Sequence, residues 1–409
     1  SSRRSSASKR CGAISEQSLT EGASMPSYHS LGQVPPKRHT QFRKPDGSLY
    51  SEELFGEEGF SGVYSLLYHQ HPPTRVTRIA KQSDVCREEW PQETHRHHHL
   101  KTHAAALGGD PIEGRRLLMY NTDCTISVVR PTQAMEYFYR NAEADELLFV
   151  HEGQGTLETT FGLLPYREGD YLLVPRGTTY RVAPGSPEQR FLVVEAFGGP
   201  IEPPKRYRNA FGQLLEHSPY CERDLHAPTE LPVHEERGEY QVRVKVNGQL
   251  MTYTFDFHPL DVVGWDGFLY PYSFNIADFE PITGRVHQPP PVHQTFEGPH
   301  FVVCSFCPRK LDYHPLAVPV PYNHSNIDSD EMIYYVSGNF GSRKGIEVSS
   351  ITLHPRGIPH GPHPGTVEKS LGAERTDELA VMVDTFRPLK LAADAQALDD
   401  PQYPFSWLE

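Results

Sequence analysis

Along most of the chain, apolar residues form short runs or alternate with polar ones, and turn-forming residues separate these segments. The segment 189–197, QRFLVVEAF, alternates well enough to be a strand with one buried face. Gly, Pro, Asp and Asn interrupt the pattern at short intervals, as they do between the strands of an all-β sandwich or barrel. The pattern predicts strands at 115–121, 124–130, 146–153, 155–162, 170–175, 190–197, 240–246, 249–257, 300–306, 331–338, 349–355 and 378–386.

Helical signals are few, and only 391–398 is rich in Ala and Leu at helix-like spacing. The 37 prolines and 21 tyrosines among 409 residues fit strand-and-turn architecture, because Pro breaks helices and separates short strands. A hydrophobic fraction of 37% argues against disorder throughout, and the length allows two domains or two lobes. The expected fold class is therefore all-β.

An internal repeat divides this pattern into two copies. One copy reads DELLFVHEGQGTLETT from Asp145 and GDYLLVPRGTTYRV from Gly169; the other reads DEMIYYVSGNF from Asp330 and SSITLHPRGIPHGP from Ser349. In this alignment Glu146 matches Glu331. Each copy is two strand blocks joined by a turn, so the repeat predicts a duplicated small β-barrel.

The second block of each copy resembles the second cupin motif, G-x5-P-x-G-x2-H/Y. The first copy fits it without a gap through Gly169, Pro175, Gly177 and Tyr180. The later copy fits through Pro355, Gly357 and His360. Cupins are jelly-roll barrels that commonly hold a metal, so we expect a double cupin. The predicted division is a disordered extension at 1–24, an N-terminal lobe without metal at 25–215, and a C-terminal lobe with the metal at 216–409.

The two copies differ at the positions where a cupin holds its metal. The first copy offers Asn141, Glu146 and Tyr180, a poor set for iron or zinc. The second offers His324, Glu331 and His360. Two imidazoles and a carboxylate with open positions form the facial triad of non-haem Fe(II) oxygenases. Since alternate side chains of a barrel strand point inward, ligands distant in sequence can converge. The sequence thus predicts Fe(II) as cofactor.

Several residues compete with this choice among the 22 histidines and neighbouring acids. His363 is the closest rival of His360, and Asp328 and Asp330 are rivals of Glu331, which we prefer because it aligns with Glu146. The run His97, His98, His99 looks like a tag-like metal cluster, and we expect it to be solvated or to lie between subunits.

Charge and cysteines exclude other classes. A net charge of −13 without a basic stripe argues against nucleic-acid binding. Six scattered cysteines are too few for a disulfide scaffold, and Cys304 and Cys307 read as buried thiols of a strand. No apolar run approaches the roughly 20 residues of a membrane span, and the first 24 residues lack a secretory signal. We expect a cytoplasmic protein that starts at Met25, although 1–24 could pass for a weak transit peptide.

From about Tyr28 to Leu391 the chain resembles the homogentisate 1,2-dioxygenase family. The resemblance rests on FDFHPLDVVGWDG (255–267), YPYSFNIADF (270–279), PYNHSN (321–326) and LHPRGIPHGP (353–362). It implies a two-lobed cupin with iron in the C-terminal lobe that forms trimers or dimers of trimers. It also implies ring opening of homogentisate by O2 to maleylacetoacetate, a step of tyrosine and phenylalanine catabolism.

The resemblance also assigns roles to residues. It gives the iron-ligand places to His324, Glu331 and His360, and pocket places that orient the substrate hydroxyls to Tyr322 and His354. The proton-handling histidine of the family lies in an H-x2-P segment. His287 in HQPP fits it, and His293 is the alternative, also counted with the substrate pocket. For the substrate carboxylate we expect Arg343, which follows the second copy's first strand block.

One departure concerns the pocket rim. The better-known form of the family reads HRN, with five residues between the histidine and the glutamate. Here the text is HSN, and His324 and Glu331 are separated by IDSD and two further residues. A hydroquinone acid with another side chain is therefore an alternative substrate. Gentisate-type dioxygenases, metal-dependent isomerases and non-catalytic storage or sensor bicupins are the rival functions. Retention of the three ligands in one lobe argues against storage.

Overall fold

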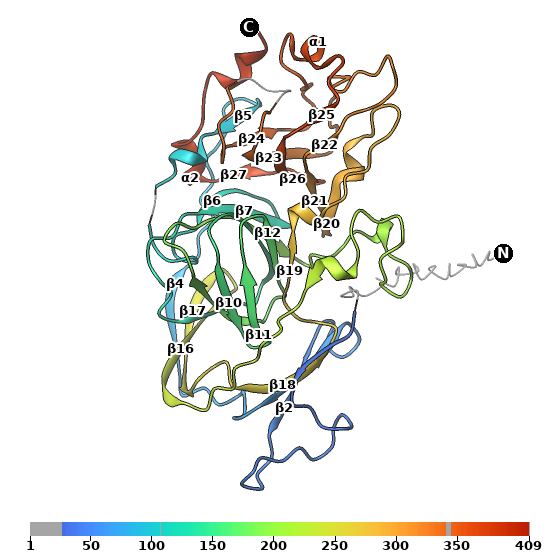
Figure 1. Ribbon diagram of the computed structural model, residues 1–409. Coiled ribbons are helices and arrows are strands. Elements are labelled where there is room, and N and C mark those ends of the chain that lie inside the picture. Colours follow the sequence, from blue (N-terminus) through green and yellow to red (C-terminus); the bar gives the residue numbers. More distant parts are fainter. Residues whose placement is uncertain (1–26, 107, 341–344, 409) are drawn as a thin grey trace, which may run out of the picture.

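The computed structural model describes residues 27–106, 108–340 and 345–408, and the structure is built almost entirely from antiparallel strands (Figure 1). All the segments that the hydrophobic pattern predicted as strands lie in strands. The predicted extension at 1–24 lies outside the described residues. None of the described helices is long and apolar enough to cross a membrane.

Two large sheets form the N-terminal barrel. The seven-stranded sheet has the order β11 (Gly162–Tyr166), β10 (Gly155–Thr159), β13 (Thr179–Pro184), β8 (Phe138–Asn141), β16 (Arg237–Val246), β17 (Gln249–Phe257) and β4 (Arg78–Asp84). The eight-stranded sheet has the order β15 (Leu225–His226), β19 (Tyr272–Asn275), β12 (Asp170–Val174), β9 (Ala144–Glu152), β14 (Arg190–Phe197), β7 (Cys124–Val129), β6 (Arg116–Tyr120) and β27 (Lys390–Leu391). Apolar side chains of both sheets, such as Leu148, Leu157 and Phe191, fill the space between them.

The C-terminal lobe is built on a six-stranded sheet, drawn at the top of Figure 1. Its order is β20 (Gln294–Gly298), β21 (Phe301–Phe306), β26 (Leu379–Thr385), β23 (Asp330–Ser337), β24 (Ile351–His354) and β5 (His98–Leu100). A small two-stranded sheet, β22 (Arg309–Lys310) and β25 (Arg375–Thr376), accompanies it. The architecture is that of an all-β double cupin, as predicted.

A four-stranded sheet lies below the N-terminal barrel in Figure 1. Its order is β1 (His29–Gly32), β18 (Val262–Gly267), β3 (Tyr64–His69) and β2 (Ser51–Gly56). The helical elements are short: η1 (Thr102–Ala104), η2 (Lys205–Tyr207), η3 (Glu222–Asp224), η4 (Ile276–Asp278), η5 (Pro290–His293), α1 (Thr366–Ser370), α2 (Ala393–Gln396) and η6 (Tyr403–Leu408). Of these, α2 is the helix that the Ala/Leu-rich segment predicted.

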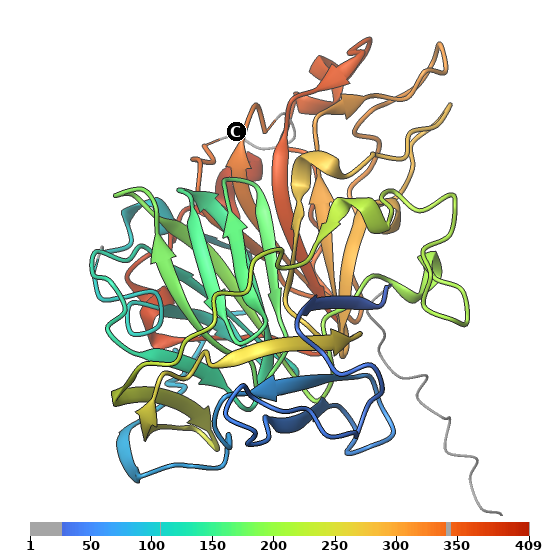
Figure 2. The same ribbon diagram turned by 60° about the horizontal axis from the view of Figure 1, so that its bottom comes forward.

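The two lobes share a hydrophobic core. The eight-stranded sheet packs on the six-stranded sheet through aromatic contacts, such as Tyr171 with Phe296 at 5.5 Å between ring centroids. Figure 2 shows the green strands of one beside the red and orange strands of the other. Burying this apolar surface stabilises both sheets. Cys304 and Cys307 lie in this region as buried free thiols, as predicted.

Strands also cross between the lobes. β5 lies between β4 and β6 of the N-terminal barrel in the chain but pairs with β24 of the C-terminal sheet, and β27 pairs with β6. The strands from 237 to 275 pair with N-terminal strands. The division at residue 215 stays a prediction, and the pairing of strands does not follow it.

The repeated DE and PRG sequences form the same local structure in both lobes. The Asp145 carboxylate accepts a hydrogen bond from the backbone N–H of Arg176 at 3.1 Å, and Asp330 accepts one from Arg356 at 2.8 Å. The glycine of each PRG turn has a positive φ, 85° at Gly177 and 77° at Gly357, which favours glycine because it has no Cβ. These matching turns are the structural form of the internal repeat.

A buried histidine joins the four-stranded sheet to the chain around it. Nδ1 and Nε2 of His69 lie 2.8 Å from carboxylate oxygens of Asp261 and Glu53. Burial opposes the charged ring, but these two carboxylates raise the pKa of His69 to about 9. Because the folded-state pKa exceeds the unfolded one, the stabilisation is complete below about pH 6.5 and is lost as the pH rises through about 9.

We expect His69→Gln to lower the free energy of unfolding by about 3 kcal/mol at pH 6, the equivalent of a shift from 6.5 to about 9. Urea unfolding between pH 6 and 10 measures this. The exposed His226→Gln serves as control and should follow the wild type. Parallel stability curves for His69→Gln and the wild type across this range would show that the ion pairs contribute nothing.

Candidate metal centre

Three predicted ligands meet at one place in the C-terminal lobe. One nitrogen each of His324 and His360 and one oxygen of Glu331 all lie within 4.8 Å of one another. Nε2 of His324 is 3.6 Å from Glu331 Oε2, and Nε2 of His360 is 3.4 Å from Glu331 Oε1. Among the described residues, no other group of three His, Cys, Asp or Glu side chains has this geometry.

Strand pairing brings these residues together. Glu331 is the second residue of β23, which pairs with β24 so that Glu331 lies opposite His354. The PRG turn follows β24 and returns the chain to the 321–326 segment. There His324 and His360 form a short antiparallel bridge, with each backbone N–H donating to the carbonyl of the other at 2.8 Å. The imidazole rings are consequently 4.2 Å apart between centroids.

The rivals of these residues have other partners. Asp330 accepts hydrogen bonds from the backbone N–H groups of Arg356 and Leu389, so it fixes the turn rather than facing the cluster. Asp328 is exposed. His363 Nε2 lies 2.9 Å from the Ser406 hydroxyl. The geometry therefore favours Glu331 and His360 over them.

Electrostatics keep Glu331 ionised. Burial would raise its pKa, but the imidazoles of His324, His354 and His360 lower the pKa of Glu331 well below its usual range. Asp384 of β26 lies opposite Glu331, and burial and the Glu331 charge raise the pKa of Asp384 well above its usual value. Of this neighbouring pair, Glu331 is thus the carboxylate that favours the charged form.

The cluster fits an iron ion by its donor atoms. Nε2 of His360 is buried and has no hydrogen-bond partner among the described residues, an arrangement that costs free energy unless something binds there. Two imidazole nitrogens and one carboxylate suit Fe(II) with open positions. His324 is one-third exposed, at 34%, so the cluster opens on its side.

Both ring nitrogens of His354, which we predicted to orient the substrate hydroxyls, contact other side chains of the protein. Its ring is fully buried, with Nδ1 2.8 Å from Glu331 Oε1 and Nε2 3.0 Å from the hydroxyl of Tyr403. If Nδ1 donates to Glu331, Nε2 accepts from the Tyr403 hydroxyl, and both nitrogens are used. That His354 contacts substrate hydroxyls stays a prediction, and the hydrogen-bond contacts of its two ring nitrogens are to Glu331 and Tyr403. His354 lies behind Glu331 and orients it.

The prediction that the histidine run 97–99 is solvated is wrong, and its alternative, a position between subunits, stays a prediction. His97, His98 and His99 are at most 6% exposed. β5 pairs with β24 at the edge of the sheet that carries Glu331, which places the run inside the C-terminal lobe. The His97 ring lies 5.8 Å from that of His360, between centroids, and its Nε2 is 3.1 Å from the carbonyl oxygen of Pro359. These contacts support the loop that carries His360.

Of the predicted proton-handling and pocket residues, Tyr322 and His287 lie beside the cluster. Tyr322 is between His324 and His287, with ring centroids 6.1 Å from the former and 5.3 Å from the latter. His293 instead packs on Phe306 at 4.7 Å and is buried, and burial, Arg309 and His287 lower its pKa to about 3. The geometry favours His287 over His293.

Arg343, the predicted partner of the substrate carboxylate, lies outside the described residues.

Strand register corrects the first copy's counterpart of the triad. Backbone N–H of Gly177 donates to the carbonyl of Asn141, as that of Gly357 donates to Asn326, each at 2.7 Å. Asn141 therefore corresponds to Asn326. Tyr180 pairs with Tyr139, as His360 pairs with His324. The counterparts of the three ligands are Tyr139, Glu146 and Tyr180, and the alignment of Asn141 with His324 was wrong by two residues.

A guanidinium stands at the first copy's carboxylate. Arg115 Nη1 donates to Glu146 Oε1 at 2.5 Å, and the Tyr180 hydroxyl donates to Glu146 Oε2 at 2.7 Å. Lys245 and Asn141 donate to the neighbouring Glu195 at 2.6 and 2.7 Å. Burial opposes the positive charge of Arg115, but Glu146 and neighbouring groups raise the pKa of Arg115 well above its usual value. The N-terminal lobe thus balances its buried carboxylate with a side-chain cation.

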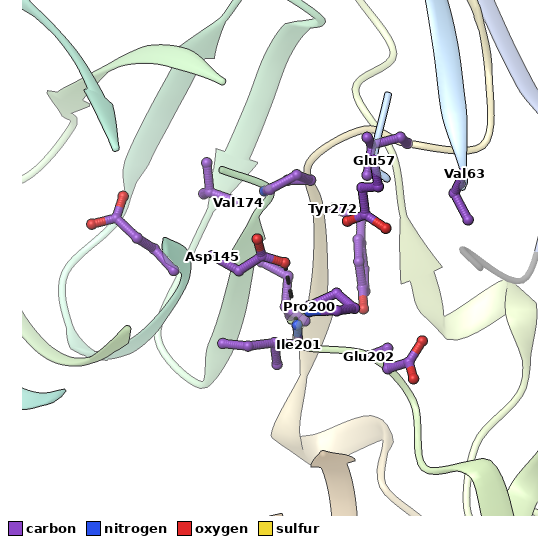
Figure 3. Close-up of a pocket in the computed structure, with 12 residues that line it drawn as sticks. Glu57, Val63, Asp145, Val174, Pro200, Ile201, Glu202 and Tyr272 are labelled. Carbon is purple, nitrogen blue, oxygen red and sulfur yellow. Dashed lines mark hydrogen bonds between the residues drawn. The ribbon is translucent and has the colours of Figure 1, made fainter. Parts of the chain in front are cut away.

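Two cavities border this framework. One, of about 30 Å³, lies at the N-terminal barrel between Glu57, Asp145, Glu202 and Tyr272 (Figure 3). It has room for a water molecule or two and not for an aromatic acid. The other, of about 540 Å³, is in the C-terminal lobe and is bordered by Lys310, Asp312, His314 and Pro319. This volume suits a small ligand.

Sequence reasoning missed Arg115 and Tyr403. Arg115 reaches Glu146 from outside the repeated blocks, and Tyr403 is in η6 near the end of the chain. Neither has a motif or a spacing that would have marked it. Both are found only in the structure: Arg115 contacts the matched Glu146 directly, and Tyr403 contacts Glu331 through His354.

Comparison with known proteins identifies the family of this chain. A family model described as homogentisate 1,2-dioxygenase N-terminal matches residues 89–276. A Saccharolobus solfataricus protein named "Putative dioxygenase SSO1533" is 45% identical over 383 residues, covering 93% of this chain and 98% of that protein. Homogentisate 1,2-dioxygenase of Sinorhizobium fredii is 26% identical, covering 96% and 94% of the two chains. The Bradyrhizobium diazoefficiens enzyme is 26% identical, covering 69% of this chain and 65% of its own length.

Among solved structures, a cupin 2 conserved barrel domain protein from Leptotrichia buccalis matches with a TM-score of 0.32 and 8% identity, covering 72% of this chain and 99% of that one. The sequence relatives carry the assignment, because a relative named a putative dioxygenase is 45% identical over nearly its whole length and homogentisate 1,2-dioxygenases and their family model match as well. This chain belongs to the homogentisate 1,2-dioxygenase family.

Proposed function

We propose that the protein is an Fe(II)-dependent ring-cleaving dioxygenase acting on homogentisate or a close hydroquinone acid. With homogentisate the product would be maleylacetoacetate. The observation that carries this proposal is the cluster of His324, Glu331 and His360, whose ligand atoms lie within 4.8 Å of one another in the lobe that kept them. Membership of the family supports the same reaction class.

His324, Glu331 and His360 would hold the iron. Bound Fe(II) supplies the redox chemistry that joins O2 to an electron-rich ring, which needs coordination positions that the protein leaves open. Glu331 is held for this by His354 and, through it, by Tyr403. Such partners behind a ligand fix its orientation and strengthen metal binding.

The substrate side of the cluster is formed by Tyr322 and His287. Tyr322 is 47% exposed and so can donate a hydrogen bond to a substrate hydroxyl without losing a buried partner. Burial lowers the pKa of His287 below its usual value, so its ring is neutral at pH 7 and can take the phenolic proton. Arg343 is the proposed partner of the substrate carboxylate.

The partners we propose are a small aromatic acid and O2, with a homotrimer or hexamer as the assembly. A different hydroquinone acid, such as gentisate, is the second candidate substrate. The segment SNIDSD between His324 and Glu331 favours this second candidate substrate, because it lies beside the cluster and differs from the corresponding segment in the better-known form of the family.

We expect oxygen uptake after anaerobic loading of the full-length protein with Fe(II) and addition of homogentisate. Uptake with gentisate alone would move the assignment to that substrate, since both are hydroquinone acids. Mg(II)-loaded protein is the control and should consume no O2, because Mg²⁺ has no redox chemistry. Absence of uptake with every hydroquinone acid, while iron is bound, would contradict the proposed function.

A further inference from the structure

We propose that Asp312 is a positioning residue, which orients His287 and balances the charge that its ring acquires on taking a proton. This inference rests on the proposed function. Asp312 Oδ2 lies 4.0 Å from Nδ1 of His287. It is the nearest carboxylate to that ring for which the structure gives a distance.

The carboxylate of Asp312 has no other use for this oxygen. Its side chain is only 10% exposed, and Oδ2 is buried without a hydrogen-bond partner among the described residues. A buried carboxylate oxygen without a donor is costly, so a donor is expected within reach. The imidazole N–H of His287 is that donor after a movement of about 1 Å, and contacts of this kind often tighten only when substrate binds.

The pairing defines which nitrogen does the chemistry. When Nδ1–H of His287 donates to Asp312, the ring is held in the tautomer whose Nε2 carries a lone pair. The proton then moves from the substrate hydroxyl to Nε2, the O–H bond breaks and the N–H bond forms. The ring becomes positive and the substrate oxygen negative. The Asp312 carboxylate stabilises the positive ring from its other side.

Other groups around His287 set the balance. Arg309 of β22 is a cation near the ring, His293 of η5 is a second imidazole, Tyr322 packs edge-on, and the backbone carbonyl of Pro319 accepts a hydrogen bond from the ring. Burial lowers the pKa of His287, and Arg309 lowers it further, whereas Asp312 and the Pro319 carbonyl raise it. Of the described residues, Asp312 is therefore the anionic side chain that acts against Arg309 on this ring.

Kinetics as a function of pH test this role. For Asp312→Asn in the iron-loaded full-length protein, we expect kcat to fall about tenfold, with KM within about twofold, because a positioned base contributes roughly 10²–10⁴-fold and only its orientation is lost. The acid limb of the kcat/KM profile should move to lower pH by about half a unit to one unit, since the ring loses its anionic neighbour.

Matched variants separate this effect from a general disturbance. Asp312→Glu keeps the charge and should recover most of the activity and the wild-type profile. Asp377→Asn removes an exposed carboxylate of the C-terminal lobe outside the cluster and should leave both unchanged. An unshifted acid limb in Asp312→Asn, or equal losses in the Asn and Glu variants, would overturn the proposal.

A second readout does not need turnover. In the full-length protein loaded with diamagnetic Zn(II) and carrying ¹³C-labelled histidine, the His287 signal is identified by its absence in His287→Asn. We expect its titration midpoint to be lower in Asp312→Asn than in the wild type. A shifted midpoint in a protein that oxidises no hydroquinone acid would refute the catalytic role along with the proposed function and leave the pairing intact. Unchanged midpoints in an active enzyme would refute the pairing alone.

Discussion

Replacing His360 by alanine should remove both bound iron and ring-opening activity. The His360 ring is buried, and its Nε2 has no hydrogen-bond partner among the described residues, so this nitrogen is available to a metal and alanine would remove it. Loss of a residue behind a ligand already costs roughly 10–100-fold in metal affinity, and loss of the ligand itself should cost more. Iron content after gel filtration and oxygen uptake with homogentisate measure the two effects.

The neighbouring His363 provides the control. His363→Gln keeps a side chain that can bond to Ser406, the contact His363 makes through Nε2, and should bind iron and turn over as the wild type does. Thermal unfolding of both variants shows whether the fold survives. Iron retained at full occupancy in a folded His360→Ala variant would show that the ligand set is wrongly chosen.

Replacing Arg115 by methionine should destabilise the N-terminal lobe by about 3–5 kcal/mol, the typical cost of leaving a buried charge without its partner. Glu146 is 1% exposed and would keep only the Tyr180 hydroxyl as a donor. Glu195 is buried as well. Burial would raise its pKa, but Lys245 and Arg115 lower the pKa of Glu195 to about 2. Urea unfolding at pH 7 followed by tryptophan fluorescence measures the loss.

Two further variants show whether the charge is the cause. Arg115→Met combined with Glu146→Leu removes both charges and should recover most of the stability, because paired apolar side chains replace a buried ion pair at little cost. Arg116→Met alters the exposed neighbour and should change stability by less than about 0.5 kcal/mol. A loss below about 1 kcal/mol in Arg115→Met would mean that the ion pair does not hold the lobe together.

The two variants test one idea about the duplicated barrel. Both lobes keep a buried glutamate at the same place, Glu146 after Tyr139 and Glu331 after His324 with the same spacing. In the first lobe the guanidinium of Arg115 neutralises the glutamate, and tyrosines stand where the imidazoles would be. In the second lobe, His324 and His360 lie beside the glutamate instead of a guanidinium. The metal ion that we propose there would supply the positive charge.

The sequence by itself determined the features that depend on neighbours in the chain. Alternation and turn residues specified the strands, for example Gln249–Phe257, because side chains of a strand point alternately to its two faces. The repeated DE and PRG texts specified the duplication, since turns of this kind are set by a few adjacent residues. The same repeat selected Glu331 over Asp328 and Asp330. His324 and His360 followed from the motif that carries them.

Only the tertiary structure decided which distant segments pair. It placed β5 at the edge of the metal-bearing sheet, and thereby buried the histidine run 97–99. It placed His354 against Tyr403, and it set the register that puts Tyr139, two residues before Asn141, opposite Tyr180. Spacing along the chain does not encode such contacts, because strand register and buried charge partners are settled by the packing of whole sheets against each other.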